Sequence, residues 1–70
     1  MYDFDEVQKL LFEQERTVVY KSLTSDKEHS RFVTIPRKFQ KDADKIIVWD
    51  INQKSWHDIQ IDTIISISGV

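Results

Sequence analysis

The feature that most constrains the fold is a run of β-branched and aromatic residues over 45–67, broken once by a polar turn. Trp49 and Trp56 stand on either side of that turn. Residues of this kind are enriched in strands, and a short polar break between two such runs is typical of a β-hairpin. We therefore expect a hairpin followed by one more strand. The expected elements are strands over 46–50, 55–61 and 64–67, a turn over 51–54, and a single 3₁₀ turn at 62–63.

A second hairpin is expected earlier in the chain. The β-formers of 17–23 predict its first strand, and the wholly polar stretch 24–30 predicts an exposed loop. Residues 31–35 predict its second strand, which Pro36 ends because proline has no N–H to donate inside a central strand. The polar residues 37–45 then predict a connector, with Phe39 held in the core.

The N-terminal segment 3–15 predicts an amphipathic helix. Asp3 is a suitable N-cap, and Glu6 follows it at the spacing of a capping box. An isolated helix of this length is marginal in water, so we expect its apolar side to pack on the strands. That side is formed by Phe4, Val7, Leu10 and Leu11.

Seventy residues allow one domain, 1–70, with a helix over 3–15 and a β-barrel over 16–67. The order of one helix and five strands predicts a mainly β fold, a small five-stranded barrel of the Sm-like or SH3-like type. Strand 46–50 is apolar on both sides, so we expect both of its faces to be covered. The predicted core consists of Val7, Leu10, Leu11, Val18, Tyr20, Val33, Ile35, Val48, Ile59, Ile61 and Ile64.

The tract from Ile47 to Ile67 resembles the C-terminal signature of the WYL-like, Sm-like SH3 β-barrel proteins encoded by tailed bacteriophages. That signature has "V-W/Y-D", a short turn and then "W-R-S-F-R-V-D-S-I". Together with the upstream segments 18–20 and 32–35, the likeness covers residues 16–67. The matching positions are Trp56, Asp62 and the apolar Ile59, Ile61 and Ile64.

The resemblance implies the barrel and a phage origin, with the cytoplasm of the infected host cell as the location, more than it implies an activity. Two arginines that follow the signature tryptophan correspond here to His57 and Gln60. If those arginines contact phosphate in the relatives, this chain lacks two such contacts.

No pattern of catalytic residues is present, and we expect a protein that is not an enzyme and needs no cofactor or metal. The chain has no cysteine, which excludes thiolate metal sites. His57 and Asp58 are neighbours in a predicted strand and so point to opposite faces. Gly69 is the only glycine, too few for a glycine-rich phosphate loop. No apolar run approaches the ~18 residues of a membrane span, so we expect no membrane partner.

The favoured functional hypothesis is a phage accessory protein that binds and modulates a host protein, through its acidic helix or an exposed edge of the barrel. Residues 1–15 carry five carboxylates and one lysine. The alternative reading of these acids is an ordinary solvated helix face. The candidate partner-binding residues are Asp5, Glu6, Glu13 and Glu15.

The second hypothesis is a module that binds single-stranded DNA or RNA, with basic residues on phosphate and a tryptophan stacked on a base. A net charge of −2 and a pI near 5.5 weigh against it. The alternatives are purely structural roles, with the basic residues in a solvated loop and the tryptophans packed in the core. A third hypothesis, a small nucleotide in the barrel mouth, is expected to need an oligomer for enough pocket volume. The candidate nucleic-acid-binding residues are Arg31, Arg37, Lys38, Lys41, Lys45, Trp56 and His57.

Overall fold

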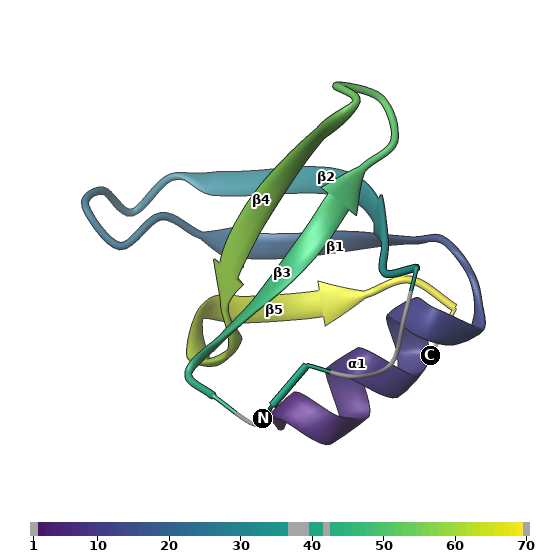
Figure 1. Ribbon diagram of the computed structural model, residues 1–70. Coiled ribbons are helices and arrows are strands. Elements are labelled where there is room, and N and C mark those ends of the chain that lie inside the picture. The colour runs from purple at the N-terminus through teal and green to yellow at the C-terminus, as the bar shows by residue number, and fades with distance from the viewer. Residues whose placement is uncertain (1, 37–39, 42, 70) are drawn as a thin grey trace.

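The computed structural model describes residues 2–36, 40–41 and 43–69 (Figure 1). Over these ranges the chain is mainly β, with one α-helix and a five-stranded antiparallel sheet, as the sequence predicts. The connector residues Arg37, Lys38 and Phe39, and with them the predicted core position of Phe39, lie outside the described residues. The elements are α1 (Phe4–Glu13), β1 (Arg16–Lys21), β2 (Glu28–Thr34), β3 (Lys45–Asp50), β4 (Ser55–Gln60), the 3₁₀ helix η1 (Ile61–Thr63) and β5 (Ile64–Ile67).

The strands are ordered β4-β3-β2-β1-β5, so β4 and β5 are the two edges of the sheet. The β3–β4 hairpin crosses over the layer formed by β1, β2 and β5 (Figure 1). Within the described strands, two residue pairs join β2 to β3, Val33 with Asp50 and Thr34 with Trp49, and Ile51 N donates to Phe32 O at 3.0 Å just beyond them. Over the described residues the sheet is not closed, and the predicted barrel closure is not confirmed.

The β1–β2 hairpin is longer than its polar sequence suggests. β2 begins at Glu28, which pairs with Lys21, so the predicted loop over 24–30 was wrong for its last three residues. Residues 28–30 are exposed, and their backbone pairs with β1 without any contribution from a buried face. Ser22 N donates to Lys27 O at 3.0 Å and closes the shorter loop.

Helix α1 begins as its sequence predicts. The Asp3 carboxylate accepts a hydrogen bond from Glu6 N at 2.8 Å, which satisfies one of the free donors of the first turn. The helix ends at Glu13, two residues earlier than expected. It packs across the concave side of the sheet, the inner face (Figure 1). Within the described residues no helix combines the length and apolar character that crossing a membrane would require.

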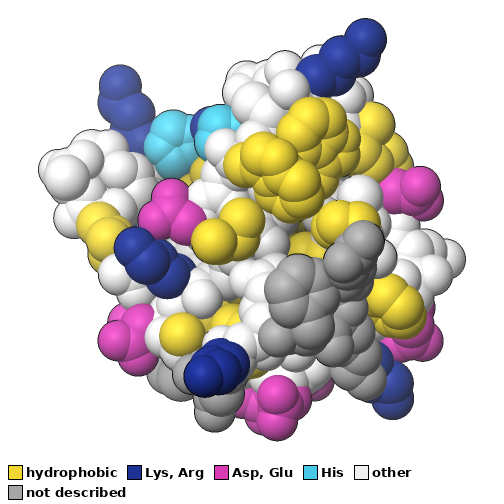
Figure 2. Space-filling view, viewed as in Figure 1, with side chains coloured by type: hydrophobic (Ala, Val, Ile, Leu, Met, Phe, Trp, Pro, Cys, Tyr) yellow, Lys and Arg dark blue, Asp and Glu magenta, His cyan; other side chains and the backbone are white. Residues whose placement is uncertain are grey.

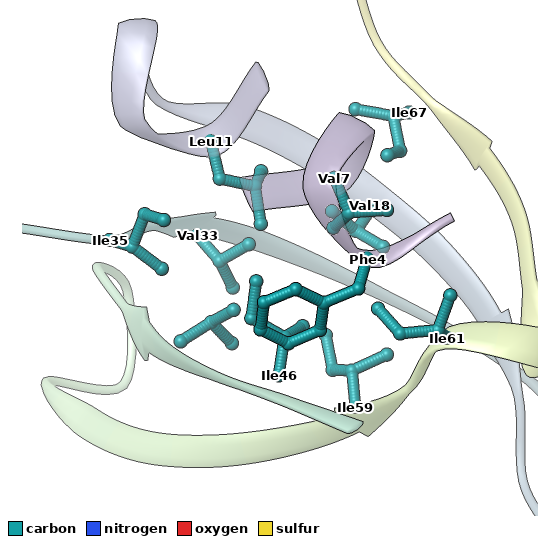
Figure 3. Close-up of a cluster of buried hydrophobic side chains, with 11 residues drawn as sticks. Phe4, Val7, Leu11, Val18, Val33, Ile35, Ile46, Ile59, Ile61 and Ile67 are labelled. Atoms are coloured by element: carbon teal, nitrogen blue, oxygen red, sulfur yellow. The ribbon is translucent and has the colours of Figure 1, made fainter. Parts of the chain in front are cut away.

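The core lies between α1 and the inner face of the sheet (Figure 3). Of the predicted core residues, Leu10, Tyr20 and Ile64 are only partly buried and pack against its margin. The buried apolar residues are Phe4, Val7, Leu11, Val18, Val33, Ile35, Ile46, Val48, Ile59, Ile61 and Ile67.

Strand β3 is covered on one side only. Ile46 and Val48 are fully buried, whereas Ile47 on the opposite side is 52% exposed. The prediction that both faces are covered was therefore wrong, since α1 packs on the inner face alone. The uncovered side of β3 and β4, which we call the outer face, is where large apolar side chains reach the surface.

Arg16 connects the end of the helix to the end of the sheet. This side chain is buried, and its Nε donates to Leu10 O at 2.8 Å while Nη1 donates to Ser68 O at 3.0 Å. Gly69 follows with φ 77°, a conformation that disfavours residues with a Cβ. A Cβ at Gly69 would also lie 2.5 Å from Arg16 Nη1. One arginine thus satisfies a carbonyl of the last helical turn and fixes the chain after β5.

Candidate functional site

The outer face carries a pair of tryptophans from opposite strands. Trp49 on β3 is directly opposite Trp56 on β4, with ring centroids 5.0 Å apart and planes at 66°. This edge-to-face contact is one of the preferred aromatic arrangements. Trp49 is half-buried, and Trp56 is 56% exposed. The pair therefore fixes a large apolar side chain at the surface of two ordered strands.

The tryptophans border a groove that is almost entirely apolar. We call it the aromatic groove: a hollow of about 420 Å³ lined by Thr34, Pro36, Trp49 and Trp56. The bend between β2 and β3 forms it, because Thr34 pairs with Trp49 and places Pro36 beside the rings. Figure 2 shows hydrophobic side chains gathered in the upper half of the view, over the β3–β4 hairpin.

A second hollow, of about 320 Å³, adjoins Trp56 and is lined also by Lys45, Ile47, His57 and Asp58. Lys45 Nζ lies 3.3 Å from Asp58 Oδ2, and both side chains are more than half exposed. A surface pair of this kind contributes little to stability. It does reduce the positive charge that Lys45 offers beside the tryptophan.

On the inner face, beyond the apolar core, polar side chains converge on Arg31. We call this set, with Tyr20, Asp50, Gln53 and His57, the Arg31 cluster. Arg31 Nε donates to the Tyr20 hydroxyl at 2.7 Å, and Nη1 lies 3.0 Å from Asp50 Oδ2. The same nitrogen is 3.1 Å from Gln53 Oε1 and 3.4 Å from His57 Nε2.

Two pKa values are displaced in the Arg31 cluster. The hydrogen bond with Tyr20, followed by that with Asp50, raises the pKa of Arg31 against the opposing effect of burial. The backbone N–H of Gln53, 2.9 Å from Asp50 Oδ1, lowers the pKa of Asp50, and Arg31 adds to this effect. The Asp50 side chain is buried and the Arg31 side chain is 21% exposed. The ion pair therefore joins β2 to β3 mostly away from solvent.

The predicted nucleic-acid-binding residues do not gather on one face in the described part of the chain. Arg31 and His57 lie together in the Arg31 cluster, whereas Trp56 and Lys45 lie on the outer face. Lys41 is exposed on the connector. Arg37 and Lys38 lie outside the described residues. Strand alternation separates His57 from Trp56, although the two are neighbours in sequence.

The predicted partner-binding acids are at the surface, as an acidic interface would require. Asp5, Glu6 and Glu13 are exposed on α1, and Glu15 is exposed just after the helix ends. Phe12 on the same helix is 48% exposed. Their exposure fits both a binding surface and an ordinary solvated helix face, so their role stays a prediction.

Sequence reasoning named Trp56 but missed the part played by Pro36 and Thr34 in the aromatic groove. Pro36 was assigned only the ending of a strand, and its proximity to the tryptophans depends on the register between β2 and β3. Among the described residues, no three His, Asp or Glu side chains are grouped closely enough to hold a metal ion.

Comparison with known proteins finds no matching family model, no matching curated protein and no matching solved structure.

Proposed function

We propose that this chain is a non-enzymatic interaction module that binds a protein partner through the outer face of β3 and β4, with Trp56 as the main contact residue. The observation that carries the proposal is a half-exposed tryptophan held on two paired strands beside an apolar groove. Tryptophan is enriched among the residues that dominate protein interfaces. Apolar patches on small soluble domains often mark such interfaces.

The chemistry of the groove favours an apolar group on the partner. Trp49, Trp56 and Pro36 offer ring surfaces, and Thr34 adds one polar side chain. A branched aliphatic or proline side chain buried there would gain about 25 cal/mol for each Å² removed from water. The acidic balance of the chain, net −2, also favours a protein partner over the polyanionic backbone of nucleic acid.

We also propose the type of fold and the type of partner. The strand order β4-β3-β2-β1-β5, with a 3₁₀ turn between β4 and β5, supports a small SH3-like or Sm-like architecture. The resemblance to the WYL-like phage proteins supports a host protein as the partner and the cytoplasm of the infected cell as the place of action.

The test compares two variants that each remove one exposed apolar side chain. The folded chain is used to capture partners from host lysate, and the affinity for the recovered protein is then measured by calorimetry. Trp56→Ala is expected to weaken binding by more than about thirtyfold, as expected for an interface residue worth about 2 kcal/mol. Leu23→Ala, at a 68% exposed position in the β1–β2 loop, is the matched control and should bind like the parent.

If the partner binds the Trp56→Ala variant as tightly as it binds the parent, the outer face is not the interface. If that partner is instead lost when Glu13 and Glu15 are reversed to lysine, the acidic helix is the interface. Amide NMR spectra of each variant establish that the sheet is retained.

Single-stranded nucleic acid is the second candidate, and one observation favours it. Exposed Trp56 shares a hollow with Lys45, the combination needed for a stacked base and a nearby phosphate. Against it, Arg31 is committed to Asp50, and Lys45 is paired with Asp58. Quenching of tryptophan fluorescence by oligonucleotides at low salt, lost as salt rises, would support this candidate. Unchanged fluorescence would exclude it.

A further inference from the structure

A further hollow lies away from the aromatic groove, between the β1–β2 hairpin and the end of β4. Its volume is about 390 Å³, within the range of small-molecule sites in proteins. Its lining comes from β1, β2, β3, β4 and η1 and from the loop after β1. One chain forms this hollow, which is a different place from the barrel mouth for which an oligomer was expected.

One wall of this hollow is aromatic, and its Tyr20 ring is held in place by a hydrogen bond. The Tyr20 and His29 rings face each other across β1 and β2 with centroids 5.6 Å apart and planes at 34°. The Tyr20 hydroxyl accepts the 2.7 Å hydrogen bond from Arg31 Nε, and Arg31 is in turn paired with Asp50. These bonds hold the Tyr20 ring, and the exposed His29 ring packs against it, so Tyr20 is the preorganised part of a surface for a flat ring.

The charged groups around the hollow favour an anion. Lys21 and Lys45 line it with two ammonium groups, against the single carboxylate of Asp58. Asp58 is paired with Lys45, while Lys21 forms no ion pair within the described part of the chain. The side chain of Gln60 also lines the hollow, with an amide that can both donate and accept.

We propose that this hollow binds a small anion that carries a planar ring, of the size and chemistry of a nucleoside monophosphate. The ring packs against Tyr20 and His29, the phosphate contacts Lys21, and Gln60 is available to the edge of the base. The ring and phosphate contacts are separate from the proposed protein interface, because Tyr20, Lys21 and His29 lie outside both hollows that adjoin Trp56. Lys45 and Asp58 line this hollow and also the second hollow beside Trp56.

The experiment is an amide NMR titration of the folded chain with adenosine monophosphate, uridine monophosphate and inorganic phosphate. Either nucleotide is expected to shift the amides of 20–24, 29 and 60. Lys21→Glu should weaken nucleotide binding by at least about tenfold, the loss expected for one charge-assisted contact. Lys27→Glu is the matched control, since it reverses an exposed lysine of the same hairpin that does not line the hollow.

The ring contact is tested separately by His29→Ala. This variant should weaken nucleotide binding and leave the response to inorganic phosphate unchanged. The proposal is overturned if no nucleotide shifts these amides, if Lys27→Glu weakens binding as much as Lys21→Glu, or if inorganic phosphate binds as tightly as the nucleotides.

Discussion

Arg31 and Asp50 link the two parts of the sheet: Arg31 Nη1 on β2 lies 3.0 Å from Asp50 Oδ2 at the end of β3. The Asp50 side chain is only 3% exposed, and the backbone of Asp50 pairs with Val33 where the sheet bends. The pair therefore adds a side-chain contact to a short junction, made by two residue pairs and the bond from Ile51 N to Phe32 O. It adds to the backbone pairs of this junction and to the core residues Ile46, Val48 and Ile59, which also hold the β3–β4 hairpin against the rest of the fold.

Acid is expected to destabilise the protein through Asp50. The pKa of Asp50 is lowered in the folded state, chiefly by the N–H of Gln53. In the unfolded chain the pKa of an aspartate is about 3.9. Between these two pKa values the unfolded chain binds more protons than the folded protein, so acid favours unfolding. The stabilisation is thus complete above about pH 5 and is lost as the pH falls through the folded pKa. Thermal melts from about pH 2 to about pH 6 measure this slope.

Two asparagine variants complete that test. Asp50→Asn should be less stable near neutral pH and should show a shallower loss of stability in acid. Asp62→Asn, at an exposed carboxylate on η1, is the control and should keep the slope of the parent. Equal slopes in the parent and Asp50→Asn would contradict the assignment.

Neighbouring isoleucines on β3 should differ strongly in their contribution to stability. Ile46→Ala removes a fully buried side chain and is expected to lower the free energy of unfolding by about 2–5 kcal/mol. Ile47→Ala removes a side chain that is 52% exposed and should cost no more than about 0.5 kcal/mol. Urea unfolding followed by tryptophan fluorescence measures both, and similar costs would mean that the outer face is covered.

The cap of α1 can be tested with two substitutions at one position. Asp3→Ala removes the acceptor for Glu6 N and should lower the free energy of unfolding by about 1 kcal/mol. Asp3→Asn keeps a side-chain oxygen that caps equally well, so it should stay close to the parent. Chemical denaturation compares the three proteins, and an equal loss in both variants would assign the effect to charge.

Arg16 should be more important to stability than its charge suggests. Arg16→Met leaves the carbonyls of Leu10 and Ser68 without their donor and is expected to cost about 1–3 kcal/mol. Lys21→Met, at the exposed other end of β1, is the matched control and should change stability little. If both variants melt at the same temperature, the buried hydrogen bonds of Arg16 contribute nothing measurable.

The helix and strands of this fold can largely be predicted from local sequence patterns. Which elements pack against one another cannot be predicted in this way. The stripe that includes Val7 and Leu11 predicts the buried side of α1, and alternation predicts that Ile46 and Ile47 face opposite ways. Neither pattern shows which side of β3 the helix covers. Polar strand residues such as His29 are misread as loop, because backbone pairing with β1 leaves no mark in hydrophobicity.

The candidate sites depend even more on contacts between distant parts of the chain. Arg31 reads as a phosphate contact in the sequence, and its partner Asp50 is 19 residues away. Arg16 carries no signal of its role, since Ser68 is 52 residues further along. Trp56 was named as a surface candidate, but the groove beside it depends on the position of Pro36 after β2.

Trp56 and His57 are adjacent in the chain, yet one belongs to the outer face and the other to the Arg31 cluster. Alternate residues of this hairpin therefore have different surroundings: the outward ones, such as Ile47 and Trp56, are exposed, and the inward ones, such as Val48 and His57, contact the rest of the fold. An evolving or engineered version could exchange its outward set wholesale and acquire a new target on an unchanged scaffold.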